Sequence, residues 1–417
     1  MIETFFDKSE ILDKSSNINF IVNKPKLEKE SVLYPTHKFE GQNNGYYKLI
    51  KDINNIYCLY YRGINNPKPC MVQTQFLTSY EELFLAKSRD GIHWKRNNKL
   101  CISHGTNLKK NNYCHNFFPI LHPIENIYYA LSGTAMYNKG LHLFKSKDGI
   151  AWHDKGLILD KTNILPQWHT NHFDSHNSLV FNPYDNFFYL FLRHNCRTKK
   201  RYVQMCKTKD FKTFTPVQEI IIENWDGNQI YNFNVLMYPN SNYFIAIPTF
   251  GILNRRNCEE KKSKHVLWSK DGLNWHYLTK NFIDCASKAY MIANGIGISN
   301  NKFLFYKHIN VNEKNNYIDL FTLDKDRIHR VECKDSEEGY ITINKVIENN
   351  MLKINYKTSN EGWIKLIISD NNNILFETKK LKGDELEFPI NLKNVVLSNK
   401  YNIKIILKNA NLFTLTI

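Results

Sequence analysis

A short stretch near the middle of the chain, Phe173-Asp174-Ser175-His176-Asn177, places a carboxylate and several hydrogen-bonding side chains directly before an apolar run. Arg193 ends the next apolar run and supplies a fixed positive charge. Losing one partner of a buried ion pair costs about 3–5 kcal/mol, so we expect Arg193 to pair with Asp174. The combination suits acid–base chemistry or the binding of a polar ligand. The alternative is that Asp174 only caps a turn.

The elements that must position these residues are indicated by an internal repeat. The pattern Ser-x-Asp-Gly-x-x-Trp begins at Ser88, Ser146 and Ser269, and a degenerate copy begins at Thr208. The Asp residues of these four copies are separated by 58, 62 and 61 residues, and residues 322–326 lie where a fifth copy belongs. A unit of about 60 residues that recurs about five times indicates a repeat architecture.

Each unit has the same local pattern. Asp-Gly between apolar runs is a hairpin signal, because Gly reaches positive φ and the Ser and Asp oxygens accept hydrogen bonds from turn amides. Two more short strand-like runs precede each hairpin, and helical periodicity is almost absent. The sequence therefore predicts an all-β fold in which residues 38–334 form a five-bladed β-propeller. It also predicts that Trp94, Trp152 and Trp275, which follow the turns at one offset, are buried structural residues.

The repeat stops near residue 335. The chain then reads as short strands with polar turns, and in the run from Tyr401 to Leu407 alternate side chains are apolar. We expect residues 335–417 to form a small β-sandwich. Residues 1–37 form an N-terminal segment that we expect to strap the two domains together.

The innermost strands of a propeller surround one central funnel, so polar residues just before the first strand of each unit should converge there. This rule adds twelve residues to Asp174: Glu40 and Tyr46 in the first unit, His115, Asn116 and Phe117 in the second, His172, His176 and Asn177 in the third, Tyr231, Asn232 and Asn234 in the fourth, and Asn294 in the fifth. Such a ring of amides, imidazoles, carboxylates and aromatic rings suits a sugar. We expect it to bind an oligosaccharide or polysaccharide. No two His residues share a metal-binding spacing, so the sequence predicts neither a metal nor another cofactor.

Composition limits the other possibilities. The formal charge is +16, but the Lys residues are scattered among Asn and Ile, which argues against nucleic-acid binding and leaves a weaker preference for acidic glycans. Nine Cys residues form no C-x-x-C pair, which favours a reducing compartment. The sequence has no apolar run of membrane-spanning length and does not begin with a signal-peptide pattern, so we expect a cytoplasmic protein that does not bind membranes. The sequence does not indicate the oligomeric state.

Several stretches carry a resemblance to a known family. Tyr60-Tyr61-Arg62-Gly63, the Ser-x-Asp-Gly-x-x-Trp copies, residues 173–177 and Phe191-Leu192-Arg193 resemble five-bladed propeller proteins related to glycoside hydrolase families 32 and 43. The resemblance is to a branch with a C-terminal β-sandwich and runs over nearly the whole chain. It implies a glycosidase in which carboxylates at the starts of early and middle blades act as nucleophile or base and as acid.

The chain also departs from those enzymes. It has no Trp-x-Asn-Asp-Pro-x-Gly motif before the first blade and no Arg-Asp-Pro motif later, which leaves Glu40 and Asp174 as the acidic pair. Our leading hypothesis is a glycoside hydrolase in which Asp174 is the base or nucleophile, Glu40 is the acid, and Arg193, His115, Asn116 and Asn177 hold sugar hydroxyls. The alternatives are a non-catalytic glycan-binding propeller and a structural protein.

Overall fold

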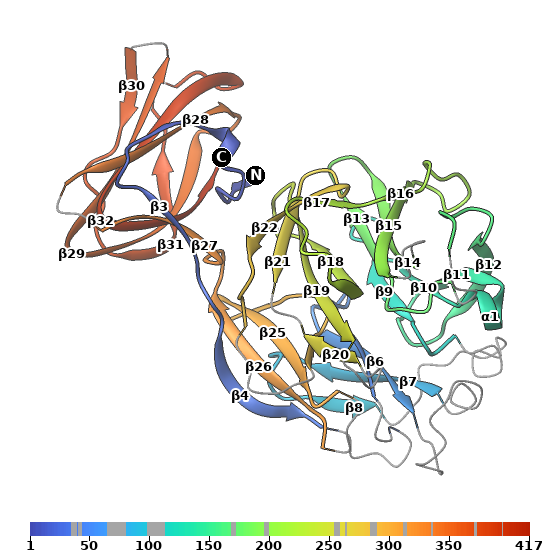
Figure 1. The fold of residues 1–417 in the computed structure, drawn as a ribbon. Coiled ribbons are helices and arrows are strands. Elements are labelled where there is room, and N and C mark those ends of the chain that lie inside the picture. The colour runs from blue at the N-terminus through green and yellow to red at the C-terminus, as the bar shows by residue number, and fades with distance from the viewer. Residues whose placement is uncertain are drawn as a thin grey trace.

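The computed structural model is built almost entirely of β-strands (Figure 1). It describes residues 1–34, 40, 44–64, 81–97, 113–167, 172–195, 200–253, 259–262, 265–283, 290–311, 315–334, 337–370, 373–393 and 395–417. The described helices are a 3₁₀ turn, η1 (Lys8–Glu10), and the short α1 (Ala135–Asn138). No helix in these ranges is both long and apolar enough to cross a membrane.

Five antiparallel sheets follow one another along the chain, which confirms the predicted five-bladed propeller. Blade one consists of β5 (Gly45–Lys51), β6 (Tyr57–Ile64), β7 (Glu81–Ser88) and β8 (Lys95–Asn97). Blade two consists of β9 (Phe118–Leu121), β10 (Tyr128–Ser132), β11 (Gly140–Ser146) and β12 (His153–Asp160). Blade three consists of β13 (Ser178–Asn182), β14 (Phe187–Asn195), β15 (Arg201–Thr208) and β16 (Gln218–Glu219).

Blades four and five carry additional strands. Blade four consists of β18 (Gln229–Met237), β19 (Phe244–Leu253), β21 (Val266–Ser269) and β22 (Asn274–Thr279), with β17 (Ile221–Ile222) and β20 (Glu259–Lys262) alongside. Blade five consists of β23 (Tyr290–Ile292), β24 (Gly297–Ser299), β25 (Lys302–Ile309) and β26 (Tyr317–Asp324). Its outer strand is β4 (Lys26–Leu33), which pairs with β26. A strand from the N-terminal segment therefore occupies the place that a hairpin after residues 322–326 would have filled.

The Ser-x-Asp-Gly turns join the third and fourth strands of their blades and share one hydrogen-bond pattern. In blade two the Ser146 hydroxyl accepts from the Gly149 amide, and Asp148 Oδ1 accepts from the amides of Ile150 and Ala151. The same bonds recur in the turns that begin at Ser88, Thr208 and Ser269. The repeat is thus a local structural device.

Each of these turns also docks on an aromatic side chain of the preceding blade. The Tyr60 hydroxyl of blade one donates to the Gly149 carbonyl, and the Tyr306 hydroxyl of blade five donates to the Gly91 carbonyl. Gly149 has a φ of 71°, and a Cβ there would lie 2.6 Å from the Tyr60 hydroxyl oxygen. The turn therefore needs glycine both for its backbone conformation and for this close approach.

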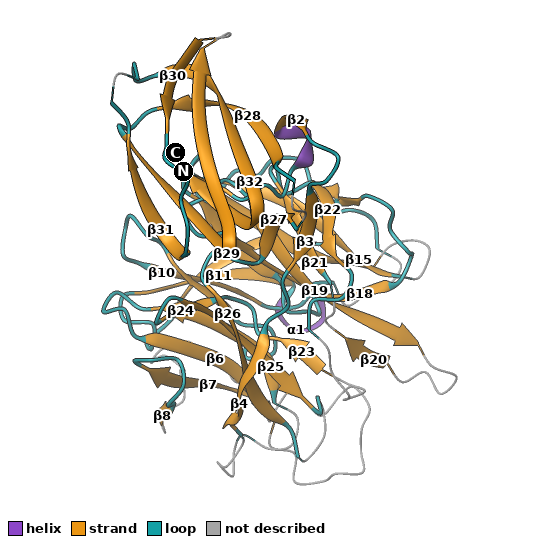
Figure 2. Cartoon of the chain, turned by 90° about the vertical axis from the view of Figure 1, so that its left-hand side faces the viewer, coloured by secondary structure: helices purple, strands orange, loops and turns teal. Residues whose placement is uncertain are grey.

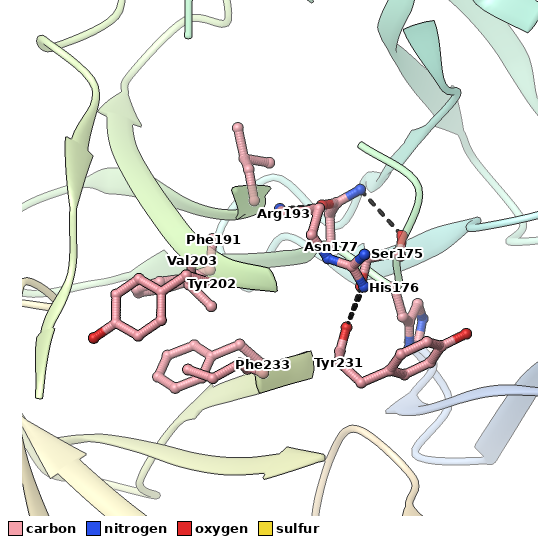
Figure 3. A pocket seen from close by; sticks show the side chains of 11 residues that line it. Ser175, His176, Asn177, Phe191, Arg193, Tyr202, Val203, Tyr231 and Phe233 are labelled. Carbon is pink, nitrogen blue, oxygen red and sulfur yellow. Dashed lines mark hydrogen bonds between the residues drawn. The ribbon is translucent and has the colours of Figure 1, made fainter. Parts of the chain in front are cut away.

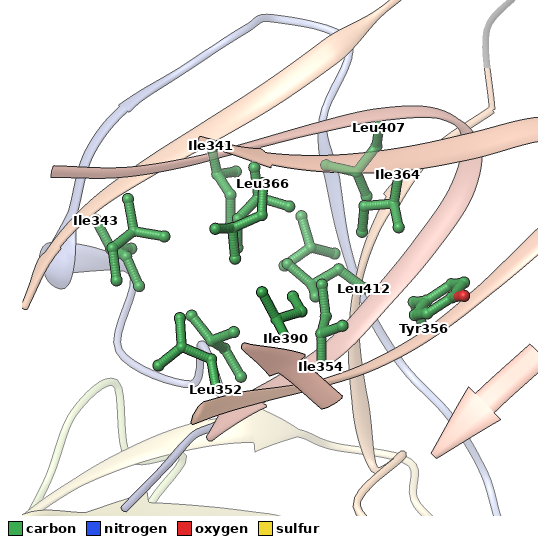
Figure 4. Close-up of a cluster of buried hydrophobic side chains, with 14 of the residues drawn as sticks. Ile341, Ile343, Leu352, Ile354, Tyr356, Ile364, Leu366, Ile390, Leu407 and Leu412 are labelled. Carbon is green, nitrogen blue, oxygen red and sulfur yellow. The ribbon is translucent and has the colours of Figure 1, made fainter. Parts of the chain in front are cut away.

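The C-terminal unit is one nine-stranded sheet folded over on itself (Figures 1 and 2). Its strands are β27 (His329–Cys333), β28 (Gly339–Ile347), β29 (Met351–Asp370), β30 (Asn373–Glu377), β31 (Asp384–Asn391) and β32 (Asn399–Thr416), with β1 (Ile2–Glu3), β2 (Ile11–Lys14) and β3 (Asn19–Val22) from the N-terminal segment. The long strands β29 and β32 run through both halves of the sheet. Ile343 and Ile368 of one half and Ile354 and Leu412 of the other share one hydrophobic core (Figure 4).

Charged side chains of the N-terminal segment bind both parts of the molecule. Lys270 of blade four pairs with Asp7, at 2.8 Å, and with Glu10. Lys345 of β28 pairs with Glu10 and, at 2.6 Å, with Glu3. Together with the strands it gives to both sheets, this network makes the segment a strap. The division at residues 37/38 and 334/335 stays a prediction.

The burial of the turn Trp residues gives a test of the blade packing. Trp152 and Trp275 are fully buried and donate to the Gly149 and Gly272 carbonyls, which confirms the prediction for both. Trp94 is only partly buried, contrary to the prediction, although it lies edge-on to Tyr306. We expect Trp152→Ala to lower the free energy of unfolding by about 3–5 kcal/mol. Trp94→Ala is the matched control and should cost clearly less; equal losses in denaturant titrations would contradict this account.

Candidate functional site

The innermost strands of the blades bring together residues that are far apart in sequence. Tyr46, His115, Asp174 and Tyr231 lie at or just before the first strands of blades one to four. The hydroxyl oxygens of Tyr46 and Tyr231 are 3.0 Å apart, so side chains of blades one and four meet across the centre. Residues just before the first strands of successive blades thus lie close together in space, as the sequence analysis expected.

Asp174 presents an accessible carboxylate in this cluster. Its side chain is 41% exposed, and its Oδ1 lies 2.8 Å from His115 Nε2. His115 Nδ1 lies 2.8 Å from Oε1 of Glu81, which is almost fully buried. The imidazole thus links two carboxylates of blades one and three.

The charges of this cluster support one another. Burial opposes a charged imidazole, but the charge of Glu81 and the hydrogen bond to Asp174 outweigh it and raise the pKa of His115 to about 10. Burial likewise raises the pKa of Asp174, but His115, Arg193 and Arg62 outweigh it and hold this pKa well below its usual value. Near neutral pH His115 is a cation and Asp174 is an anion. Arg62 Nη1 is 3.6 Å from Glu81 Oε1 and completes the network.

Two amides predicted to bind sugar instead hold the turn that carries Asp174. Asn116 Nδ2 donates to the carbonyls of Phe173 and Gly133, and its Oδ1 accepts from the Gly133 amide. Asn177 Nδ2 donates to the Phe173 carbonyl, and its Oδ1 accepts from the Arg193 amide. Phe173 has a φ of 64°, a strained value for a bulky residue. The two amides stabilise this backbone, so we infer that they position Asp174 rather than touch a ligand.

Tyr46 is a buried ring packed among the charged and aromatic side chains of this cluster. The Arg62 guanidinium lies 4.5 Å from the centre of its ring, and the His176 ring stacks on it at 5.2 Å. Tyr46 also has a positive φ, 55°. Strained non-glycine residues cluster at functional sites, and here they lie on both sides of the cluster.

Arg193 lies behind the turn but does not make the predicted ion pair. Its Nη2 donates to the Tyr231 carbonyl at 2.5 Å, and its guanidinium lies 5.5 Å from the centre of the Tyr231 ring (Figure 3). Among the described residues Asp174 forms its ion pair with His115 instead. Arg193 is close enough to lower the pKa of Asp174, so its influence is electrostatic.

Glu40 is placed differently from Asp174. It is buried, its Oε1 accepts from the Tyr61 hydroxyl at 2.8 Å, and Arg96 Nε is 3.5 Å away. Successive residues of a strand point to opposite faces, so Tyr61 and Arg62 project to opposite sides of β6. Glu40 therefore contacts the opposite face of this strand from Glu81. The pairing of Glu40 with Asp174 stays a prediction.

The remaining predicted residues have structural contacts. The Ser175 hydroxyl is 3.1 Å from Asn232 Oδ1, and the His172 carbonyl accepts from the Ala135 amide. Asn294 Oδ1 accepts from Lys48 Nζ at 2.9 Å, and Asn294 Nδ2 donates to the Ser178 hydroxyl. Asn294 thus joins blades one, three and five near the axis. Within the described ranges no group of three or more His, Cys, Asp or Glu could hold a metal ion.

Two small recesses flank His176. One has a cavity volume of about 10 Å³ and is bounded by Ser175, Arg193, Tyr202 and Tyr231 (Figure 3). The other also has a cavity volume of about 10 Å³ and is bounded by Tyr46, Asn234 and His308. Each therefore has room for about one water molecule.

Solved structures share this fold although the sequence differs from theirs. No family model and no curated protein matches the chain. A glycosyl hydrolase from Bacteroides ovatus superposes with a TM-score of 0.52 at 12% identity, over 74% of this chain and 95% of its own. The catalytic domain of a GH62 α-L-arabinofuranosidase from Coprinopsis cinerea gives 0.50 at 9% identity, over 72% and 97%. These similarities confirm the five-bladed propeller that the resemblance implied.

The bridge through His115 predicts a pH effect. In His115→Asn the side-chain amide can take the place of Nδ1, the nitrogen that contacts Glu81, but not of Nε2. In His115→Gln the amide can take the place of Nε2, the nitrogen that contacts Asp174, but not of Nδ1. Without the imidazolium the pKa of Asp174 should rise, so ligand binding or turnover should fail at a higher pH than in the native protein. The shift should be about one pH unit or more and larger in His115→Asn. If activity or binding is lost at the same acidic pH in the native protein and in both variants, His115 does not control the pKa of Asp174.

Lys48 gives a second prediction. It is 5% exposed, its Nζ lies 4.4 Å from the centre of the Phe118 ring, and burial lowers its pKa to about 7. In the unfolded chain the Lys48 amine stays protonated up to about pH 10.5, whereas in the folded protein it loses its proton above about pH 7. The buried lysine therefore lowers the free energy of unfolding by its full amount below pH 7, and by less as the pH rises toward 10.5. We expect Lys48→Met to raise the free energy of unfolding by about 1–3 kcal/mol at pH 6, a net value that includes the loss of the hydrogen bond to Asn294.

The increase in the free energy of unfolding that Lys48→Met gives should be smaller at pH 9.5 than at pH 6. Denaturant titrations at the two pH values measure it, and Lys51→Met, on the same strand but exposed, is the matched control. A destabilised Lys48→Met protein at pH 6 would contradict the prediction.

Proposed function

We propose that this protein is carbohydrate-active and that a glycan binds in the central funnel beside Asp174. The observation that carries the proposal is an accessible carboxylate held ionised by His115 next to the Tyr46 and Tyr231 rings. Sugars need hydrogen-bond partners for their hydroxyls and flat apolar surfaces for their C–H faces. The Asp174 carboxylate offers the first, and the partly exposed Tyr231 ring offers the second. The fold shared with glycoside hydrolases supports the same reading by analogy.

The first candidate activity is glycoside hydrolysis. Asp174 would serve as base or nucleophile, because it is ionised at neutral pH and its side chain is open to the funnel. His115 and Arg62 would stabilise its charge, and Arg193 and Tyr231 would contact the sugar. The reaction also needs a group that protonates the leaving oxygen. Glu40 is the residue that the sequence predicts for this role.

The second candidate is a glycan-binding propeller without catalysis. A good general acid has a pKa near the working pH, whereas His115, the protonated group that contacts Asp174, has a pKa of about 10. Glu40 is buried against Tyr61 and Arg96. These two observations favour binding without cleavage.

The charge balance of the site favours an acidic glycan. Among the described residues, Arg62, Arg193, Arg201 and the His115 cation interact electrostatically with the carboxylates of Glu81 and Asp174. Cationic side chains therefore outnumber carboxylates in this network. An acidic sugar would balance these charges, in keeping with the basic sequence.

A reducing, cytoplasmic location is also part of the proposal. Among the described residues Cys58, Cys206 and Cys333 are free and buried, and burial raises the pKa of the Cys58 and Cys206 thiols to about 12. Such thiols are poor nucleophiles and pack as apolar side chains.

A screen of oligosaccharides tests the function. Native protein, Asp174→Asn and Glu40→Gln are each incubated with arabino-, xylo- and galacturono-oligosaccharides, with binding measured by calorimetry and cleavage by product analysis. A hydrolase should cleave at least one substrate, and Asp174→Asn should lower kcat about 10²–10⁴-fold. Asp13→Asn, an exposed change in the C-terminal sheet, is the matched control.

The variants separate the candidates. Binding without cleavage in the native protein identifies the binding propeller. Full activity in Glu40→Gln removes Glu40 from the mechanism. Neither binding nor cleavage of any sugar would overturn the proposal.

A further inference from the structure

The turns at one end of the blades lie opposite the funnel residues. In blades one to four the loop between the first two strands lies beside the Ser-x-Asp-Gly turn, because a residue just after the loop pairs with the Ser or Thr that begins the turn. These pairs are Tyr57 with Ser88, Tyr128 with Ser146, Phe188 with Thr208, and Phe244 with Ser269. Asp174 and His115 precede the first strands of their blades, whereas these loops follow the first strands. Loops and turns thus occupy the end of each blade that is remote from the funnel.

In blade four the N-terminal segment of the chain binds at this end. Lys270, the second residue of the Ser-x-Asp-Gly turn, pairs with Asp7 Oδ2 at 2.8 Å and with Glu10. The Phe6 ring packs edge-on against Tyr243, with 5.6 Å between the ring centres. The N-terminus lies between the C-terminal unit and blade four (Figure 1). Blade four thus binds an extended segment through carboxylates and an aromatic ring.

The basic residue of this contact recurs in the other turns. The position of Lys270 is basic and exposed in blades one, two and three, where it is occupied by Arg89, Lys147 and Lys209. Blade three reproduces the surroundings as well. Lys209 Nζ lies 4.7 Å from the centre of the Phe187 ring, and Lys270 Nζ lies 5.5 Å from the centre of the Tyr243 ring, at the matching position of the second strand. The cation that binds carboxylates in blade four is therefore presented to solvent in three other blades.

The tips of the neighbouring loops differ between blade four and blades one to three. In blade four the tip is Asn240, whose carbonyl accepts from the Ile2 amide of the N-terminal segment at 2.8 Å. The tips of blades one, two and three are large hydrophobic residues, which are 55%, 66% and 48% exposed: Ile53, Ile124 and Tyr184. Single exposed hydrophobic residues are common, but three at one position of successive blades indicate an interaction surface. We call the surface formed by these three tips and the three basic turn residues the turn face.

We propose that the turn face of blades one to three is a docking surface for an acidic peptide segment of a partner protein. Carboxylates of that segment pair with the basic turn residues, as Asp7 and Glu10 pair with Lys270, and its apolar side chains cover the exposed tips. A peptide is favoured over a lipid surface or a nucleic acid because blade four binds a peptide segment of this chemistry through the same turn position. The surface lies at the opposite end of the blades from Asp174, so the inference goes beyond glycan binding.

Two synthetic peptides that differ only in charge test the surface. The acidic peptide has the sequence of residues 2–12 with both ends blocked and a fluorescent label, and in the neutral peptide Gln and Asn replace Glu3, Asp7 and Glu10. Native protein is titrated into each peptide, and binding is followed by fluorescence anisotropy. The acidic peptide should bind at least about fivefold more tightly, since one exposed ion pair contributes up to about that factor, and added salt should reduce the difference. Equal affinity of the two peptides, or no binding of either, would overturn the inference.

A charge-reversal variant locates the bound peptide. The variant combines Arg89→Glu, Lys147→Glu and Lys209→Glu, and it should bind the acidic peptide at least about tenfold more weakly than the native protein. Lys161→Glu is the matched control, because it reverses an exposed charge at the opposite end of blade two and should leave the affinity unchanged. Undiminished affinity in the charge-reversal variant would place the peptide on another surface, such as that of blade four, and overturn the proposal.

A second variant tests the apolar tips without a change of charge. Ile53→Ser, Ile124→Ser and Tyr184→Ser together keep every cation of the turn face and should weaken binding of the acidic peptide about tenfold or more. Native affinity in this variant would reduce the contact to charge alone and overturn the proposal. Asp174→Asn should bind the peptide as the native protein does, and a loss of binding there would place the peptide in the funnel and refute the turn face.

Vesicles identify the competing anionic partner. Native protein and the charge-reversal variant are sedimented with vesicles of equal parts phosphatidylcholine and phosphatidylserine. The proposal expects the native protein to stay in solution while it binds the acidic peptide. Sedimentation of the native protein that is lost in the charge-reversal variant, without binding of the peptide, would assign the turn face to an anionic membrane and refute the peptide.

Discussion

The propeller depends on one repeated contact, the docking of each Ser-x-Asp-Gly turn on an aromatic side chain of the blade before it. The Tyr60 and Tyr306 hydroxyls bind turn carbonyls, while Phe211, in the degenerate turn, stacks on Tyr129 of blade two. Because each turn fixes its own blade and also the neighbouring one, the spacing between blades is nearly uniform. The first strands then meet around one axis, and the polar residues before them converge.

Convergence alone does not make these residues available to a ligand. The amides of Asn116 and Asn177 are fully used in holding the strained turn at Phe173. The charged groups are divided differently, because His115 contacts the carboxylates of both Glu81 and Asp174, while the charges of Arg193 and Arg201 also interact with that of Asp174. The open chemistry of the funnel is therefore one ionised carboxylate beside an excess of positive charge.

The strap formed by the N-terminal segment completes the architecture. It supplies β4 to the last blade and β1 to β3 to the C-terminal sheet, and its acidic residues bind lysines on both sides. Removing it would leave the outer edge of blade five and two edges of the C-terminal sheet without their partner strands, and open edges invite aggregation. The N-terminal segment thus joins the two β units through strand pairing and ion pairs.

The sequence by itself determined the period, the five blades, the hairpin turns and the place of Asp174, because all of these follow from short-range patterns that recur. Only the tertiary structure revealed Glu81 and Arg201 as members of the site. Both begin the third strand of their blades, and their position beside Arg62 and Arg193 depends on the pairing register between the second and third strands. The roles of Asn116 and Asn177 were equally hidden, since whether an amide is free depends on partners contributed by other strands. The sequence identifies the chemical groups of each segment, but the packing between blades decides which of these groups contact one another.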